Sequence, residues 1–271
     1  RVSSMITQGG KRDGANMAVM SVRHPDILSF IDCKKEEGDI HNFNISVAVD
    51  TAFMDAVKLG HEYTLNDPKT GFPLSTLNAR EIFLKIIQGA WRNGEPGMIF
   101  LDRINADNKV GEEYGEMIAT NPCGEQPLLG YESCNLGSIN VAKFIYPYAG
   151  PGRWESHIDW DRLQHVVRNA VHFLDNVIDA NDYSIPEIKE MTRATRKIGL
   201  GVMGLHSFLQ KNSIPLESVM SKTWNNKIFK HIQTEVDEAS KKLAEERGSC
   251  PDAEEYGVKE RFSNKTAIAP T

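Results

Sequence analysis

Residues 120–141, TNPCGEQPLLGYESCNLGSINV, are the most informative stretch of this 271-residue chain. Pro122, Gly124 and Pro127 oppose a regular helix or strand at its start, because proline lacks a backbone N–H and glycine favours turns. The sequence therefore predicts that Cys123 lies on a turn.

Two polar residues accompany this cysteine, Asn121 before it and Glu125 after it, each two positions away. Alternate residues of an extended stretch point to the same side, so we expect Asn121, Cys123 and Glu125 to face one substrate together. They would supply an amide, a reactive sulfur and a general base. Cys134 follows eleven residues after Cys123 and reaches the same site if the loop folds back. The residues leave open an alternative, a buried cysteine in a Pro/Gly turn.

Outward from this stretch, apolar strands alternate with amphipathic helices. Short apolar runs predict strands at residues 17–22, 43–49, 98–101 and 197–202. Apolar residues spaced by three and four predict helices that begin near residues 26, 51, 79, 159, 186 and 218. Such alternation is typical of an α/β fold with a largely parallel sheet, and it does not distinguish a barrel from an open sheet.

Capping residues mark several helix ends. Asn78 is a predicted N-cap with Glu81 at the third helical position, Pro186 suits a first helical position, and Gly248 suits a C-cap. The two longest helices are expected to bury one face each, formed by Leu163, Val166, Val167, Ala170, Val171, Leu174 and Ile178 and by Trp224, Ile228, Ile232, Val236, Ala239 and Leu243.

Composition excludes several classes of protein. The chain has 31 basic and 37 acidic side chains, a formal net charge of -6, and so lacks the basic surface of a nucleic-acid-binding protein. No apolar run reaches about 18 residues, so we expect no membrane span. No leader opens the chain, and we expect a cytoplasmic protein with reduced thiols. The cysteines, at positions 33, 123, 134 and 250, form no C-x-x-C pair, so a zinc site is not expected.

The chain length favours one large or two modest domains. The first residue is Arg rather than Met, and residues 266–271, TAIAPT, predict a strand that runs into an uncapped turn. We therefore expect an excerpt of a longer protein, with its N- and C-terminal parts missing.

NPCGEQPLL followed by ESCNLGSIN resembles the active-site finger loop of ribonucleotide reductase large subunits, most closely the adenosylcobalamin-dependent (class II) kind. Further segments resemble the same family in the same order: GGKRDGANM at 9–17, HPDILSFID at 24–32, NFNISV at 42–47, RKIGLGVMG at 196–204 and IAPT at 268–271. The resemblance implies that residues 1–271 are part of a single catalytic domain, with the finger loop at about 119–135. That domain is the ten-stranded α/β barrel of the ribonucleotide reductase and glycyl radical type, incomplete in this chain.

The resemblance also implies roles for four residues. Cys123 corresponds to the cysteine that becomes a thiyl radical and abstracts the 3′-hydrogen of the ribose. Glu125 corresponds to the carboxylate that takes the 3′-hydroxyl proton, and Asn121 to the amide that holds the substrate hydroxyls. Cys134 corresponds to one of two thiols that end as a disulfide. The family's second thiol lies upstream of the GG-x-R segment, where this chain has no cysteine, and Cys33 and Cys250 match no catalytic position.

Substrate contacts are implied at the two ends of the chain. Gly9 and Gly10 correspond to a close backbone approach to the nucleotide, and Pro270 and Thr271 to the start of the turn that holds its phosphates. Residues 34–41 resemble the allosteric loop that reports a bound deoxynucleotide or ATP effector. Their alternative interpretation is a solvated run of charges.

The resemblance thus implies a reductase that makes DNA precursors from ribonucleotides, with diphosphates as the expected substrates. It implies adenosylcobalamin as cofactor, thioredoxin or a similar dithiol as electron donor, and a homodimer when complete; the fragment alone is expected to be inactive. One alternative is a class I reductase with a metal-radical partner subunit. The other is a non-catalytic nucleotide-binding fragment in which Cys123 is buried.

Overall fold

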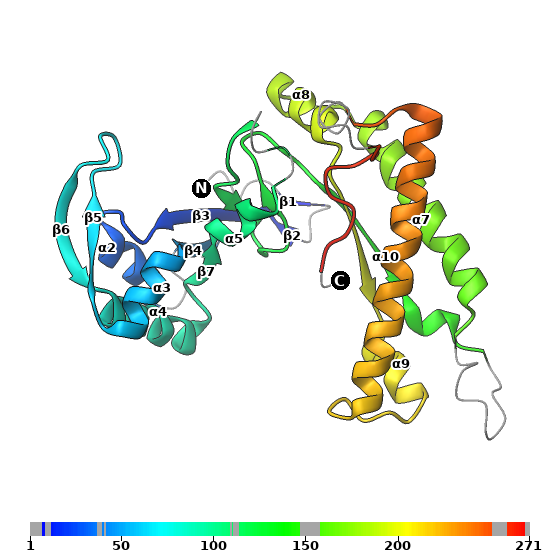
Figure 1. Ribbon diagram of the computed structural model, residues 1–271, viewed down its shortest axis with the longest axis horizontal. Coiled ribbons are helices and arrows are strands. Elements are labelled where there is room, and N and C mark those ends of the chain that lie inside the picture. The colour runs from blue at the N-terminus through cyan, green and yellow to red at the C-terminus, as the bar shows by residue number, and fades with distance from the viewer. Residues whose placement is uncertain are drawn as a thin grey trace. The chain divides into compact units, whose positions relative to one another are not determined.

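The structure is a computed structural model that describes residues 7–8, 12–36, 40, 42–108, 110, 114–146, 158–250 and 259–268. The chain divides into two compact units, Arg1–Gly130 and Tyr131–Thr271 (Figure 1).

The first unit is built on a three-stranded parallel sheet. Strand β4 (Phe43–Val49) lies between β3 (Asn16–Ser21) and β7 (Gly97–Phe100), and Asn16 pairs with Phe43 at its start. The described residues also form short antiparallel pairs of β1 (Thr7–Gln8) with β2 (Arg12–Asp13) and of β5 (Glu62–Asn66) with β6 (Pro73–Asn78). The predicted strands at 17–22, 43–49 and 98–101 are confirmed within one residue.

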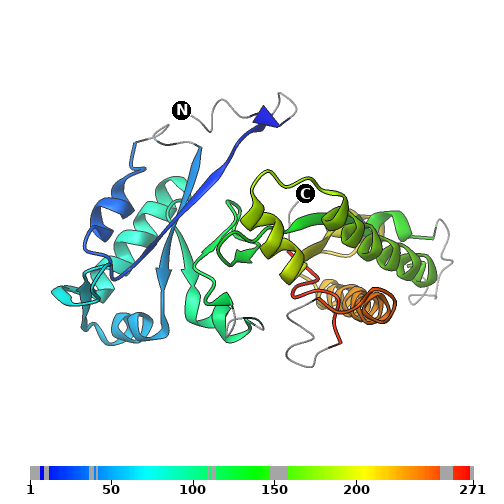
Figure 2. The same cartoon turned by 90° about the horizontal axis from the view of Figure 1, so that it is seen from above.

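The helices of this unit follow its strands: α2 (Ile27–Asp32), α3 (Thr51–Leu59), α4 (Ala79–Asn93) and α5 (Leu101–Ala106). Figure 2 shows α4 beside α2, and α4 also contacts α3. The predicted cap of α4 is confirmed, because the side chain of Asn78 accepts from the N–H groups of Arg80 and Glu81. Helix α4 ends at Gly94, whose φ of 86° is left-handed. Strand β4 and these helices enclose an apolar core that includes Val47, Phe53, Ile82 and Ile86.

The second unit pairs β10 (Asn135–Asn140) with β11 (Ile198–Met203) in parallel. The segment 264–267 continues the sheet along the free side of β11, where Leu200 N donates to Lys265 O and Ala267 N donates to Leu200 O. This contact confirms an extended segment at Thr266. Within each unit the described strands form open sheets.

Two long helices, α7 (Trp160–Ala180) and α10 (Val219–Arg247), pack together in the second unit (Figure 1). The predicted apolar faces are confirmed: Val167 and Ile228 are fully buried, and the other predicted positions are buried or half-buried. Pro186 opens α8 (Pro186–Thr195) as predicted. Shorter elements are η1 (Val141–Phe144) and α9 (Leu205–Lys211).

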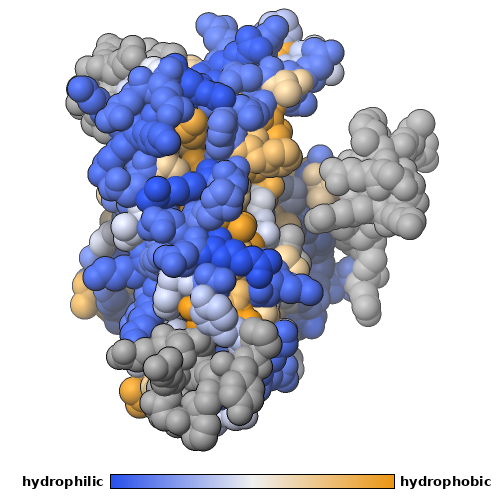
Figure 3. All heavy atoms as spheres, turned by 90° about the vertical axis from the view of Figure 1, so that its right-hand side faces the viewer, coloured by the Kyte–Doolittle hydropathy of each residue, from blue (hydrophilic) through white to orange (hydrophobic). Residues whose placement is uncertain are grey.

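The face that carries α7 and α10 is largely hydrophilic, and its hydrophobic side chains are seen mainly in a central band between hydrophilic ones (Figure 3). Within the described ranges, every helix is too short or too polar to cross a membrane.

Candidate active site

A short hairpin displays the cysteine loop in the first unit. Strands β8 (Ala119–Thr120) and β9 (Pro127–Leu128) pair antiparallel and enclose residues 121–126. Asn121 N donates to Gln126 O at 3.0 Å and continues this pairing by one step. The loop is therefore closed at its base by backbone hydrogen bonds.

Within the loop the backbone reverses direction in a tight turn. Gly124 N donates to Asn121 O at 3.0 Å, and Gln126 N donates to the side-chain Oδ1 of Asn121 at 3.0 Å. Gly124 has a φ of 84°, a left-handed conformation that is strained for residues with a side chain. The prediction of a turn at Cys123 is confirmed, but the expectation of an extended stretch is wrong. Pro122 and the left-handed Gly124 bend the backbone, so alternation does not set the side-chain directions.

Cys123 is exposed at this turn and forms no disulfide with any described residue. Cys123 is therefore not the buried cysteine of the alternative interpretation. A thiol at an exposed loop position can meet a reactant from outside the chain.

Glu125 is half-buried, and its Oε2 is buried without a hydrogen-bond partner in the part of the chain that the structure describes. The Nε2 of the neighbouring Gln126 is in the same condition. A buried polar atom without a partner costs free energy, about 1–3 kcal/mol or more for a charged group. Glu125 Oε2 is therefore suited to accept a hydrogen bond from a bound ligand, and Gln126 Nε2 is suited to donate one.

Strand β4 also reaches this loop. The Nδ2 of Asn44 donates to the carbonyl oxygen of Pro122 at 2.5 Å. Reasoning from sequence did not identify this contact, because 78 residues separate its partners.

Cys134 lies in the second unit, one residue before β10, and is half-buried. Its Sγ donates to Asn135 O at 3.6 Å. The residues before it are fixed by polar contacts: Glu132 pairs with Lys197 at 2.8 Å, both buried, and the Ser133 hydroxyl contacts that of Thr192 at 2.7 Å. The two residues before Cys134 are thus held next to β11 and α8.

The remaining candidate residues, Gly9, Gly10, Pro270 and Thr271, lie outside the described residues, as do residues 37–39 and 41 of the expected allosteric loop. No group of three or more His, Cys, Asp or Glu residues suited to a metal ion occurs in the described ranges.

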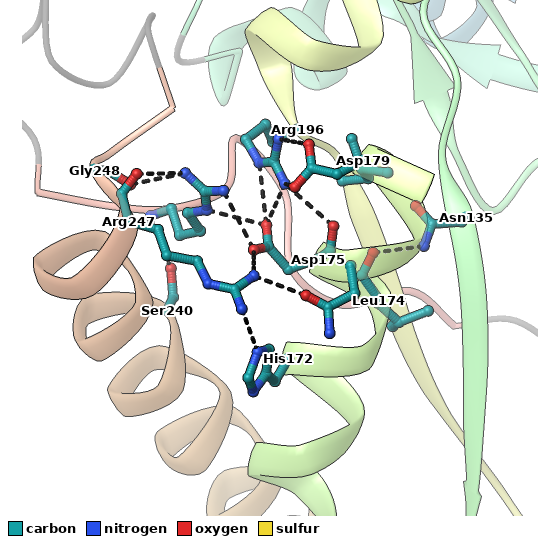
Figure 4. Close-up of polar contacts among 12 residues, drawn as sticks. Asn135, His172, Leu174, Asp175, Asp179, Arg196, Ser240, Arg247 and Gly248 are labelled. Atoms are coloured by element: carbon teal, nitrogen blue, oxygen red, sulfur yellow. Dashed lines mark hydrogen bonds and ion pairs between the residues drawn. The ribbon is translucent and has the colours of Figure 1, made fainter. Parts of the chain in front are cut away.

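A buried cluster of charged side chains lies in the second unit around Asp175, which has no exposed surface (Figure 4). Its carboxylate pairs with Arg196 at 2.5 Å and with Arg247 and Arg261, both at 3.0 Å. Arg196 also pairs with Asp179 at 2.9 Å and, by donating hydrogen bonds to that carboxylate, lowers the pKa of Asp179. Since these residues join α7, α10, the C-cap of α8 and the segment 259–268, the cluster has a structural role.

Comparisons with known proteins cover nearly the whole chain. Residues 1–269 match the family model "Ribonucleotide reductase, barrel domain". The chain is 46% identical to a vitamin B12-dependent ribonucleoside-diphosphate reductase of Thermoplasma acidophilum and 43% identical to one of Mycobacterium tuberculosis; each alignment covers 99% of this chain. It spans 35% and 38% of those two proteins.

A solved structure has the same fold. The class Id ribonucleotide reductase alpha subunit of Actinobacillus ureae superimposes with a TM-score of 0.72 at 26% identity, over 94% of this chain and 45% of that one. The expected α/β barrel class is thereby confirmed. On the match over residues 1–269, the chain belongs to the ribonucleotide reductase family and corresponds to its barrel domain.

Proposed function

We propose that the complete protein reduces ribonucleoside diphosphates to 2′-deoxyribonucleotides and that Cys123 is its radical site. The observation that carries this proposal is an exposed cysteine placed between Asn121 and Glu125 on a hairpin loop, in a chain that matches the reductase barrel throughout. The names of the two relatives, vitamin B12-dependent ribonucleoside-diphosphate reductase, support the substrate class.

Three residues of the loop have separate roles toward the substrate. The Cys123 sulfur, as a thiyl radical, takes the hydrogen atom from the 3′-carbon, and the S–H bond forms as the C–H bond breaks. Glu125 accepts the 3′-hydroxyl proton, and its unpartnered Oε2 is suited to receive that hydrogen bond. Asn121 accepts from Gln126 N through Oδ1, which orients its Nδ2 as a donor to a substrate hydroxyl.

The reduction itself consumes a pair of thiols. The bond from the 2′-carbon to its hydroxyl breaks, the hydroxyl leaves as water, and a hydrogen replaces it on carbon. Cys123 then returns its hydrogen atom to the 3′-carbon, which restores the thiyl radical. Cys134 and a second thiol of the complete protein supply the two electrons and become a disulfide. A dithiol donor such as thioredoxin then restores both thiols.

We propose adenosylcobalamin as the cofactor of the complete protein. The exposure of Cys123 fits this group, since the thiol is accessible from outside the loop. When bound, the cofactor supplies the oxidising equivalent that removes the hydrogen atom from the Cys123 sulfur. What this chain contributes is the turn that holds that sulfur in place.

The proposal also covers the domain organisation, the oligomeric state and the effector and substrate contacts of the complete protein. Both units belong to one catalytic barrel domain, which the match of one barrel model to residues 1–269 supports. The complete protein is a cytoplasmic homodimer whose loop at residues 34–41 responds to a deoxynucleotide or ATP effector, and Gly9, Gly10, Pro270 and Thr271 contact the substrate.

The test is an anaerobic assay of the complete protein with ribonucleoside diphosphate, adenosylcobalamin and a dithiol, and with no second protein. We expect deoxyribonucleoside diphosphate, and none from the Cys123→Ser variant. Activity that instead requires an iron- or manganese-loaded partner would establish the class I alternative. Nucleotide binding without reduction under either condition would establish the non-catalytic alternative.

A further inference from the structure

The peptide that joins Pro122 to Cys123 is held from outside its loop. Its carbonyl oxygen accepts a hydrogen bond from Asn44 Nδ2 at 2.5 Å. Asn44 is half-buried and belongs to β4, the central strand of the three-stranded sheet. A side chain of the main sheet therefore contacts the backbone immediately before the cysteine.

The hydrogen bonds within the loop do not hold the 122–123 peptide. Gly124 N and Gln126 N both donate to Asn121, and Asn121 N donates to Gln126 O. These three bonds close the base of the loop and its turn, but they do not involve the Pro122 carbonyl. The plane of the 122–123 peptide is thus set by Asn44 rather than by these bonds.

Asn44 itself sits on a well-fixed strand end. Its neighbour Phe43 pairs with Asn16, and Asn16 N donates to Asn42 O at 2.8 Å. Lys34 donates through Nζ to the carbonyl of Phe43 and pairs with Glu95 at 2.7 Å. The donor of the Asn44 bond is therefore held independently of the loop that it contacts.

We propose that Asn44 is a positioning residue that directs the sulfur of Cys123 by fixing the orientation of the 122–123 peptide. The inference rests on the proposed role of Cys123 as the hydrogen-abstracting group. Hydrogen transfer requires the reacting atoms to be aligned at contact distance, and a displacement of about 1 Å costs about 100-fold in rate. Asn44 touches no reacting atom and acts only through the backbone of the loop.

The test compares Asn44→Ala, Asn44→Asp and Asn44→Gln in the complete protein. We expect the first two to lower kcat by about 10- to 100-fold with KM within about twofold, since binding groups are unchanged. Asn44→Gln keeps an amide donor and should recover part of the lost rate. Asn16→Ala is the matched control, because Asn16 is an asparagine of the adjacent strand whose Nδ2 donates to Asn42 O instead; it should retain kcat.

A second measurement is independent of turnover. The alkylation rate of Cys123, read by peptide mass spectrometry, is compared with that of half-buried Cys33 in the same molecules. Burial raises the pKa of the Cys33 thiol, which makes it a slow internal reference. Loss of the Asn44 bond should raise the Cys123 to Cys33 ratio at least about threefold, because the loop is released.

The outcomes separate the two proposals. Wild-type kcat and an unchanged alkylation ratio in Asn44→Ala would overturn the positioning role. A kcat loss with an unchanged ratio, or an equal loss in Asn16→Ala, would also overturn it. If the wild-type protein reduces no ribonucleotide, the proposed function fails, while the alkylation ratio still decides whether Asn44 orients the thiol.

Discussion

Cys134 is a half-buried residue beside β10, and its thiol is assigned to electron supply rather than to hydrogen abstraction. Replacing Cys134 by Ser should permit at most one turnover per protein molecule, because no disulfide can form and be reduced again. The measurement is product per protein over time with thioredoxin present. Sustained cycling in this variant would remove Cys134 from the proposed pair, while Cys33→Ser should cycle normally.

For single residues, the sequence predicted where the chain turns better than it predicted where the side chains point. Pro122 and Gly124 marked the turn at Cys123 correctly, since their backbone restrictions are local. The side-chain directions inferred from an extended strand were wrong for the same reason, because a reversing backbone has no alternation. The contact from Asn44 was not predictable, since it depends on how β4 packs against a loop 78 residues away.

Among the elements, β5 carries a buried tyrosine with an unusual titration. Tyr63 donates to Val22 O at 3.0 Å, and burial raises its pKa from 10.0 to about 12. Because the folded-state pKa is the higher one, its contribution to stability is complete below pH 10 and is lost as the pH rises toward 12. That difference corresponds to about 3 kcal/mol.

We therefore expect the first unit to lose stability between about pH 10 and 12, and Tyr63→Phe to flatten this loss. Hydrogen exchange of peptides from β5 and α3 at increasing pH measures it. An equally steep alkaline loss in Tyr63→Phe would show that another group is responsible.

The elements around Asp175 depend on a buried charge. Asp175→Asn leaves Arg196 and Arg261 buried with no full counter-charge, and should destabilise the packing of α7 on α10 by about 3–5 kcal/mol. Hydrogen exchange of peptides from these helices measures the loss. Glu238→Gln breaks an exposed pair with Lys241 on α10 and should cost at most about 1 kcal/mol. Equal effects of the two variants would contradict the role given to the cluster.

The long helices and the apolar strands were predictable, whereas short strands without an apolar pattern were not. The boundaries of α3, α4 and α10 follow from caps and apolar spacing, which are local signals. The hairpin of β5 and β6 was missed because β6 is mostly exposed and has no apolar alternation. Strands β8 and β9 have two residues each, too few for any pattern, although they display the cysteine.

For the molecule as a whole, the resemblance carried by a few short motifs extended to a family match over residues 1–269. The alternation of strands and helices predicted an α/β fold but not a barrel, because closure depends on how distant strands pair. The motifs predicted the family, and the motifs together with the alternation of strands and helices predicted the fold class.

The most direct test of the radical role of Cys123 compares Cys123→Ser with Cys33→Ser in the complete protein, with nucleotide binding and anaerobic reduction measured on the same samples. Serine nearly preserves the size of the side chain but is a far poorer carrier of a hydrogen atom. We expect Cys123→Ser to bind nucleotide as the wild type does and to form no deoxyribonucleotide, while Cys33→Ser does both. Reduction by Cys123→Ser at more than about a tenth of the wild-type rate, less than about 1.4 kcal/mol of lost transition-state stabilisation, would contradict the radical role.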